Sequence, residues 1–373
     1  MTPTLIRRLS VETLDIPLRE PFGIAGGAQE LAANLLVTVE LADGTVGIGE
    51  AAPFPAFNGE TQAGAQAAVL RARAVVEGAD VRGWRRLAAA LEAALPGQGS
   101  ARCAIETALL DALTRRAGMP LWAFFGGAET SLVTDITIPT GTAAHAEEAA
   151  ARIAAAGFET IKLKVGGAGA RADLDRIAAI HGVAPGCALI LDGNGGLTAA
   201  AALALVEEAR RLGARVTLLE QPVPRDDHEG MRELCRRAGV DVAADEALNG
   251  VADAARIAAE RSATVLNLKL MKHGIAEALD IAAIGRAAGM KLMIGGMVES
   301  VLAMTTSACL AAGLGGFAFV DLDTPLFLAE NPFAGGFAQE GPRLDLSGIQ
   351  AGHGTAYPGS GASGPYAPVG RYP

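Results

Sequence analysis

The chain has 373 residues, of which 50% are hydrophobic and 19% charged, and its formal net charge is −10. This composition excludes a largely disordered chain and predicts a large core, and the acidic balance argues against nucleic acid as a partner. The longest apolar run, residues 308–320, is too short to span a bilayer. The first residues lack the apolar stretch of a signal peptide, and the four cysteines form no CxxC pair. We therefore expect a cytoplasmic protein that does not bind membranes.

The first 127 residues have the pattern of strands followed by helices. Residues 35–41 alternate between apolar and polar, and Ala42-Asp43-Gly44 predicts a turn into a second strand over residues 45–48. Helical periodicity follows over residues 63–77, 84–94 and 100–117, with Ser100 as a candidate N-cap and Gly118 as a stop. This order predicts an α+β domain over residues 1–127.

From about residue 132, short strand-like runs alternate with alanine-rich helical patterns. The predicted strands are residues 134–140, 160–165, 188–194, 216–222, 241–247, 264–270, 291–297 and 317–323. Helical patterns lie between them, for example over residues 143–156, 199–212 and 275–288. Eight strands alternating with seven helices predict a (β/α) barrel over residues 128–325. An open doubly wound sheet is the alternative, because periodicity alone does not close a sheet.

One candidate functional side chain lies at the end of each predicted strand. The spacing between successive candidates fits the length of one βα unit. The candidates are Thr137, Lys164, Asp192, Glu220, Asp245, Lys269, Met297 and Asp321. Nearly every unit thus places a chemically capable group at the carboxyl end of its strand, which is where barrel enzymes hold their active sites.

Three of these residues, Asp192, Glu220 and Asp245, are carboxylates on consecutive strands. They would repel one another at one barrel mouth unless a cation lay between them. An all-oxygen donor set without His or Cys favours Mg²⁺ over zinc. The alternative is that each carboxylate merely caps a helix after its βα loop.

Lysines form the second element of the pattern. Lys162 and Lys164 are two residues apart on one strand, so they share a face, and we expect each to lower the pKa of the other toward that of a general base. Lys269 lies on the sixth strand, across the barrel from the second. Two lysines on opposite sides of a substrate can perform racemisation or epimerisation. An exposed strand edge and a Schiff-base aldolase are the alternatives.

Asp321 and Asp323 share a face at the end of the eighth strand. Two unpaired carboxylates invite a cationic partner such as a substrate ammonium, and the alternative is a structural pair bound to a barrel lysine or arginine. We expect Asn194 and Glu246 to contact the metal ligands rather than the metal itself.

Together these residues resemble the enolase superfamily, muconate-lactonizing-enzyme subgroup. The resemblance rests on the Lys-x-Lys at 162 and 164, on Asp192, on Glu220 with Gln221-Pro222, on Asp245-Glu246 and on Lys269 in NLKLMKHGI. Asp321-Leu322-Asp323 resembles the mark of its dipeptide epimerases, which are related to L-Ala-D/L-Glu epimerase. The likeness extends from residue 1 to about residue 345 and includes the PFGIAGG and NPFAGGF segments.

The resemblance implies an enolase-like fold, with an N-terminal capping domain and a modified (β/α)7β TIM barrel. It also implies that residues 326–350 return to the cap, and we expect the Gly- and Pro-rich residues 351–373 to form a flexible tail.

The mechanism that the resemblance implies uses one Mg²⁺ per subunit, held by Asp192, Glu220 and Asp245. Lys164 and Lys269 would exchange the α-proton of the C-terminal residue of an L,L-dipeptide through an enediolate. The lysine base and the Mg²⁺-stabilised enediolate are general features of that superfamily rather than deductions from this sequence. Asp321 and Asp323 would hold the dipeptide ammonium. The remaining residues expected to bind substrate are Lys162, Thr137, Gly296, Met297, Val298, Phe22 and Ile24.

The expected substrate is a small or apolar dipeptide. Relatives specific for Ala-Glu often carry a basic residue in the loop that corresponds to residues 22–27, and this chain has no Arg or Lys between Phe22 and Glu30. Alternatives with the same first chemical step are N-acylamino acid racemase, o-succinylbenzoate synthase and muconate cycloisomerase. A non-catalytic binding protein is a further alternative. The sequence leaves open whether the chain forms a homo-oligomer.

Overall fold

The computed structural model describes residues 2–24 and 27–357, with only the backbone described for residues 21–24, 27 and 28. Eight parallel strands form one sheet whose spatial order is the chain order. They are β5 (Ile136–Ile138), β6 (Thr160–Lys164), β7 (Ala188–Asp192), β8 (Arg215–Glu220), β9 (Asp241–Ala244), β10 (Val265–Leu268), β11 (Lys291–Ile294) and β12 (Phe317–Val320). All eight predicted strands are confirmed.

The last strand lies against the first. The backbone N–H of Asp135, next to β5, donates to the carbonyl of Val320 at the end of β12 across 2.9 Å. The backbone N–H of Leu322 donates to the Thr134 hydroxyl at 2.9 Å. The sheet therefore closes into a (β/α) barrel, and the open doubly wound alternative is wrong.

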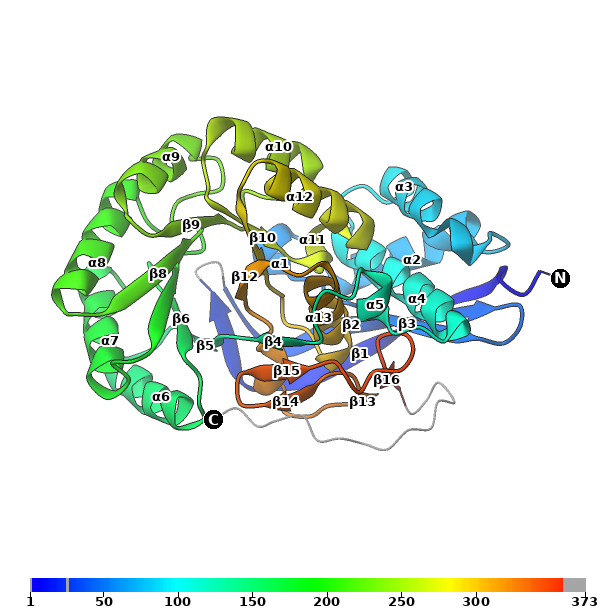
Figure 1. Ribbon diagram of the computed structural model, residues 1–373, viewed down its shortest axis with the longest axis horizontal. Helices are drawn as coiled ribbons and strands as arrows, with labels where there is room; N and C mark the ends of the chain where they lie inside the picture. The colour runs from blue at the N-terminus through cyan, green and yellow to red at the C-terminus, as the bar shows by residue number, and fades with distance from the viewer. Residues whose placement is uncertain (1, 25–26, 358–373) are drawn as a thin grey trace.

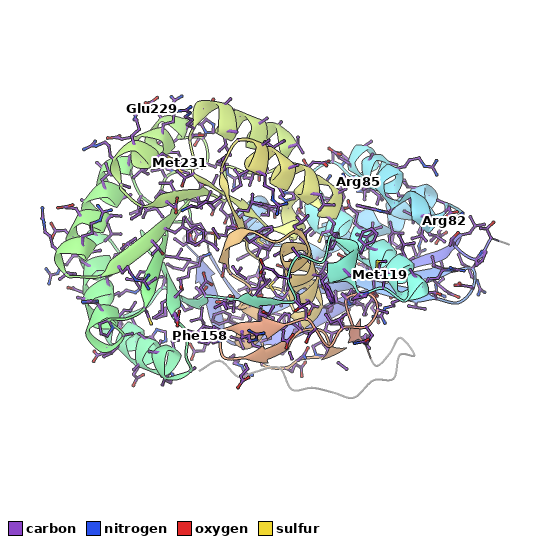
Figure 2. All side chains as sticks on the ribbon, viewed as in Figure 1. Arg82, Arg85, Met119, Phe158, Glu229 and Met231 are labelled. Atoms are coloured by element: carbon purple, nitrogen blue, oxygen red, sulfur yellow. The ribbon has the colours of Figure 1, made fainter. Side chains whose placement is uncertain are left out.

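Seven helical connections join the barrel strands, and most of them form an outer arc around the sheet (Figure 1). In α9, Glu229 is exposed and Met231 is buried, so the helix turns one face to solvent and the other to the strands (Figure 2). The helices are α6 (Ala143–Ala155), α7 (Ala170–Val183), α8 (Ala199–Arg211), α9 (His228–Arg237), α10 (Val251–Glu260), α11 (Leu270–His273) with α12 (Ile275–Ala287), and α13 (Val301–Leu314).

Helix α13 is buried along nearly its whole length, because it packs against barrel strands and the N-terminal domain at once. It contains the first part of the apolar run at residues 308–320. Among the described residues, no helix combines the length and the apolarity that a membrane crossing requires.

The N-terminal domain is an antiparallel sheet in the order β1-β2-β3 with helices packed on it. Gly47 and Gly49 allow α4 to approach β3 closely, since a Cβ at Gly49 would lie 2.1 Å from the Ala104 carbonyl oxygen. The elements are β1 (Ile6–Ile24), β2 (Gly27–Leu41), β3 (Val46–Ala51), α1 (Pro55–Asn58), α2 (Gln62–Val76), η1 (Val81–Gly83), α3 (Trp84–Ala94), α4 (Gly99–Ala117) and α5 (Leu121–Phe124).

For helix α4, the predicted C-terminal end is confirmed and the predicted N-cap is wrong. Gly118 ends the helix in the left-handed conformation, with a φ of 63°, as predicted. Ser100 is not the N-cap, because the helix begins at Gly99 and Gln98 holds the cap position. The Ser100 hydroxyl instead donates to the buried carboxylate of Glu60.

The C-terminal segment runs back along the barrel to the N-terminal domain. Its elements are η2 (Thr324–Phe327), β13 (Ala334–Gly335), β14 (Ala338–Glu340), β15 (Arg343–Asp345) and β16 (Thr355–Ala356), and β15 pairs with β4 (Ser131–Val133). The Ala329 N–H donates to the Pro17 carbonyl at 2.7 Å.

The expectation of a flexible tail is wrong for residues 351–357. His353 is fully buried, and its backbone N–H donates to Asp111 in α4 at 3.1 Å. Strand β16 pairs with β13. Composition did not predict this order, because the buried contacts of a few residues stabilise the segment despite the flexibility expected from its glycines. Residues 358–373 lie outside the described part of the chain.

Candidate active site

A cavity opens at the carboxyl ends of the barrel strands, beneath the N-terminal domain. That domain contributes Phe54 and Phe57, from the segment around α1, and the barrel contributes the rest of the wall. The barrel residues are Thr137, Lys162, Lys164, Asn194, Lys269, Gly296, Met297, Asp321, Asp323 and Thr324. The structure thus brings most of the predicted site residues into one cavity, at the strand ends where barrel enzymes carry out chemistry.

Asp192, Glu220 and Asp245, which we call the strand-end triad, lie side by side because of the strand register. Asp192 pairs directly with Glu220 across β7 and β8. Glu220 pairs with Ala243, and Asp245 lies two residues beyond Ala243. Each of the three residues is 0% exposed. Three carboxyl groups are therefore held together away from water, an arrangement that needs positive charge beside it.

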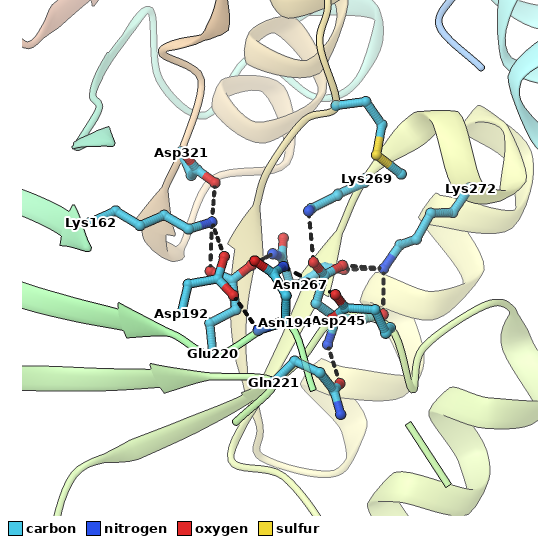
Figure 3. Close-up of polar contacts among 12 residues, drawn as sticks. Lys162, Asp192, Asn194, Glu220, Gln221, Asp245, Asn267, Lys269, Lys272 and Asp321 are labelled. Atoms are coloured by element: carbon cyan, nitrogen blue, oxygen red, sulfur yellow. Dashed lines mark hydrogen bonds and ion pairs between the residues drawn. The ribbon is translucent and has the colours of Figure 1, made fainter. Parts of the chain in front are cut away.

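Lysine ammonium groups supply that charge in the structure (Figure 3). Lys162 Nζ lies 3.0 Å from Asp192 Oδ2 and 2.8 Å from Glu220 Oε2. Lys164 Nζ lies 2.7 Å from the same oxygen of Asp192, and Lys269 Nζ lies 2.7 Å from Asp245 Oδ2. β6 and β10 are four strands apart in the eight-stranded ring, so Lys164 and Lys269 approach the cavity from opposite sides.

The electrostatics of the triad differ from residue to residue. Burial and the neighbouring Asp192 raise the pKa of Glu220 to about 8. Burial alone would raise the pKa of Asp192 as well, but Lys162 and Lys164 outweigh it and lower that pKa to about 2. The pKa of Asp245 is also depressed, because Lys269 and Lys272 outweigh its burial. Glu220 is thus the member of the triad whose ionised form would be stabilised by added positive charge.

The prediction that Lys162 has a lowered pKa is wrong. Its burial favours a lower pKa, but Asp192, Asp321 and Glu220 together raise the pKa well above the usual value. The pKa of Lys269 is raised for the same reason, since Asp245 and Glu220 outweigh its burial. Attraction to the surrounding carboxylates outweighs the repulsion between these lysines.

Asp321 and Asp323 lie on another side of the cavity, after β12. Lys162 Nζ donates to Asp321 Oδ2 at 2.7 Å, so the predicted alternative of a barrel lysine partner holds for this residue. The backbone N–H of Thr137 donates to Asp323 Oδ2 at 2.6 Å. Burial and then Asp321 raise the pKa of Asp323 to about 7.

A third carboxyl group, Asp135, completes what we call the Asp135 cluster. One carboxyl oxygen from each of Asp135, Asp321 and Asp323 lies within 4.8 Å of the others, and all three residues are buried. Among the described residues, this is the group of carboxylates whose oxygens gather closely enough to share a cation. In the strand-end triad, Lys162 bridges Asp192 and Glu220, and Lys269 contacts Asp245.

Other predicted positions fall around the cavity or outside it. Val298 is not among the lining residues, and its carbonyl accepts a hydrogen bond from Asn34 of β2 at 2.9 Å, which ties the barrel to the N-terminal domain. Asn194 donates to Glu246 at 3.1 Å, and its backbone N–H donates to Asp192 at 3.0 Å. The side chains of Phe22 and Ile24 lie outside the described part of the structure.

Sequence reasoning missed Asp135, Asn267, Lys272 and Thr324. Asn267 donates to Glu220 Oε1 at 2.9 Å, and Lys272 Nζ lies 3.0 Å from Asp245 Oδ1. Asp135 and Asn267 each lie two residues before a predicted site residue, Thr137 and Lys269. Strand alternation puts such pairs on one face, so this signal was available in the sequence.

Comparison with known proteins assigns the chain to a family. Residues 144–358 match the family described as "Enolase C-terminal domain-like", and residues 7–126 match "Mandelate racemase / muconate lactonizing enzyme, N-terminal domain". The chain belongs to the mandelate racemase/muconate lactonizing enzyme family of the enolase superfamily. This family is enzymatic, and its enolase-like fold accounts for the domain arrangement described above.

Members of the family that resemble this chain include dipeptide epimerases. The chain is 53% identical over 352 residues to the aromatic dipeptide epimerase of Herpetosiphon aurantiacus, covering 94% of this chain and 99% of the relative. A crystal structure of a mandelate racemase/muconate lactonizing enzyme from Roseiflexus sp. shares 60% identity with a TM-score of 0.91, covering 95% of this chain and 99% of that one.

A liganded structure is also similar. The dipeptide epimerase of Enterococcus faecalis V583, in complex with Mg and the dipeptide L-Leu-L-Tyr, has a TM-score of 0.90 and 32% identity. The match covers 95% of this chain and all of that one, 100%. Relatives of this chain thus include epimerases, and one protein of this fold binds Mg and a dipeptide together.

Proposed function

We propose that the protein is a Mg²⁺-dependent dipeptide epimerase that inverts the α-carbon of the C-terminal residue of its substrate. The observation that carries this proposal is the pair of lysines, Lys164 and Lys269, which line opposite sides of one cavity and each contact a carboxylate of the strand-end triad. Two opposed proton carriers suit a reaction that removes a proton from one face of a carbon and returns one to the other. The dipeptide epimerases among the relatives support the same reaction.

The strand-end triad would hold the metal ion. Its three carboxyl groups offer only oxygen donors and are completely buried, and burial together with the neighbouring Asp192 raises the pKa of Glu220 to about 8. This donor set suits Mg²⁺. When bound, the ion supplies positive charge that makes the α-proton beside a substrate carboxylate more acidic.

Lys164 and Lys269 would move the proton. One lysine in its neutral form accepts the α-proton, and the opposite lysine donates a proton to the other face of the same carbon. Lys269 would share Asp245 with the cation, so its ammonium loses part of the interaction that holds its pKa high here. Lys162, in contact with both acidic clusters, would hydrogen-bond the substrate carboxylate.

Asp321 and Asp323 would hold the N-terminal ammonium of the dipeptide. The pair lies in the cavity wall and carries more negative charge than Lys162 can balance. A dipeptide carries an ammonium group at one end, and this pair would bind it. The pair therefore favours a dipeptide over the substrates of the related racemase, synthase and cycloisomerase. Those reactions do not need an ammonium site.

The substrate side chain would be apolar. Phe54, Phe57 and Met297 form the apolar part of the cavity wall, and each of the described cations of that wall already contacts a carboxylate. An aromatic or aliphatic side chain can pack on such a surface, whereas a glutamate side chain finds no free cation there. We further infer a reducing, cytoplasmic setting, since all four cysteines are free.

The test is incubation of the protein with Mg²⁺ and a library of L,L-dipeptides in D₂O, followed by mass spectrometry. The proposal predicts the gain of one deuteron at the α-carbon of the C-terminal residue, strongest for apolar dipeptides. Exchange with N-acylamino acids but with no dipeptide would contradict it and favour the racemase alternative. No exchange with either class, by protein that binds Mg²⁺ and dipeptide, would favour a binding protein.

A further inference from the structure

Asp135 is a buried carboxyl group that the proposed reaction leaves without a role. It lies just before β5, is 3% exposed, and is not among the residues that line the cavity. Neither of its carboxyl oxygens accepts a hydrogen bond from any residue that the structure describes. A buried carboxylate without donors is strongly unfavourable, so the side chain must be accommodated in another form.

The charges around Asp135 indicate which form that is. Asp321 and Asp323 face it from the end of β12, within the 4.8 Å of the Asp135 cluster, and Lys162 is the cation of β6 that faces the same cluster. Burial first, and then the two aspartates, raise the pKa of Asp135 well above its usual value, although Lys162 opposes the shift. When carboxyl groups share a site in this way, one of them keeps its proton.

The proton gives Asp135 a hydrogen-bond donor, and the carboxyl groups of Asp321 and Asp323 are the acceptors that lie near it. Asp323 is already fixed by the backbone N–H of Thr137, at 2.6 Å. Asp321 is held on one oxygen, Oδ2, by Lys162 at 2.7 Å. A second donor on Asp321 would fix the rotation of its carboxyl plane, which one hydrogen bond to Lys162 leaves free.

We propose that Asp135 is a positioning residue, whose carboxylic acid donates a hydrogen bond to Asp321 and so orients the Asp321–Asp323 pair for the ammonium of the substrate. The inference rests on the proposed function, because it assigns that ammonium to the pair. It adds a neutral, proton-carrying third member to the site. Asp135 touches neither the substrate nor the strand-end triad.

Two substitutions of similar size separate this role from the alternatives. The amide of Asp135→Asn can donate a hydrogen bond as the acid does, whereas Asp135→Leu cannot donate. With Mg²⁺ and L-Ala-L-Phe, we expect D135N to keep KM within about threefold of the wild type. D135L should raise KM about tenfold or more, the effect of losing one charge-assisted hydrogen bond, with kcat within about threefold. The Mg²⁺ affinity of both variants should equal that of the wild type.

Infrared difference spectroscopy of the wild type against D135N tests the proton itself, without substrate. At pH 7 the wild type should show the carbonyl band of a protonated carboxylic acid that D135N lacks. Absence of that band, or an increase in KM for D135N as large as that for D135L, would show that Asp135 acts as an ionised ligand and overturn the proposal. If D135L fails to fold, the spectrum and D135N still decide. If the wild type exchanges no dipeptide, the proposed function fails, while the spectrum still reports on Asp135.

Discussion

Two acidic clusters lie beside the same lysine-lined cavity, and they differ in the positive charge that surrounds them. The strand-end triad contacts the ammonium groups of four lysines, Lys162, Lys164, Lys269 and Lys272. Of the described lysines and arginines, only Lys162 forms an ion pair with the Asp135 cluster. The structure therefore has several ammonium groups beside the triad and an excess of negative charge at the other cluster. This difference favours a metal and the chemistry at the first, and a substrate cation at the second.

Replacing the proton carriers should have the largest effect. Lys164→Ala and Lys269→Ala are each expected to lower the rate of epimerisation by about 10²–10⁴-fold, the range that a positioned general base contributes. Because each lysine serves one face, each variant should retain α-proton exchange with only one epimer of the substrate. Deuterium incorporation into the separate L,L- and L,D-dipeptides measures this.

The matched control for these variants is Lys291→Ala. Lys291 is a half-exposed barrel lysine whose Nζ lies 2.6 Å from Asp241, remote from the cavity. The K291A substitution should leave the rates of α-proton exchange unchanged for both epimers. Equal loss of exchange for both epimers in K164A and in K269A would contradict the assignment of one face to each lysine.

Glu220→Gln tests the cation of the triad. The substitution removes one carboxylate while keeping its shape and its acceptor for Asn267, so the fold should persist. We expect Mg²⁺ affinity, measured by calorimetry, to fall on the order of 100-fold. Asp321→Asn is the control, and it should change dipeptide binding while leaving Mg²⁺ affinity within a few-fold. Loss of Mg²⁺ affinity in D321N but not in E220Q would reverse the two clusters.

Asp323→Asn and pH together test the substrate cation. The pKa of Asp323 is about 7, so its negative charge is lost as the pH falls through that value. The amine of a dipeptide loses its proton at about pH 8. KM should therefore be lowest between about pH 7 and 8 and rise at lower pH. In D323N, KM should be about tenfold higher at pH 7.5 and no longer rise between pH 7.5 and 6. An unchanged acid limb in D323N would rule out Asp323 as its source.

A substitution in the apolar part of the cavity wall should have the smallest effect on substrate binding. The Phe57 ring lies 5.1 Å from Lys269 Nζ and lines the cavity. Phe57→Leu should raise KM for an aromatic dipeptide about two- to fivefold and leave Mg²⁺ affinity unchanged. A larger effect on Mg²⁺ than on KM would show that Phe57 acts on the triad rather than on the substrate. Titration of both ligands against F57L and the wild type provides the comparison.

The strand-end triad could be predicted from sequence because its members occupy equivalent positions on consecutive strands. Regular register then brings them together, as the direct pairing of Asp192 with Glu220 shows. The eight barrel strands could be predicted for a similar reason, since each is a short apolar run between helical patterns. The assignment of roles to these residues stays a prediction.

What could not be predicted depends on contacts between distant segments. The raised pKa of Lys162 follows from carboxylates on several distant segments that surround it, which no local pattern contains. The order of residues 351–357 follows from the burial of His353 against Asp111, 242 residues away in the chain. Asp135 could not be predicted from the strand-end pattern, because that pattern marks Thr137 and Asp135 lies one layer below it.

The most direct test of the two-cluster account compares one dipeptide with its N-acetylated form. Exchange of the α-proton of L-Ala-L-Phe and of N-acetyl-L-Ala-L-Phe is measured with the Mg²⁺-loaded wild type. The expected kcat/KM is at least about 100-fold higher for the free dipeptide, since acetylation removes the cation that Asp321 and Asp323 would bind. Equal values for the two compounds would contradict an ammonium site.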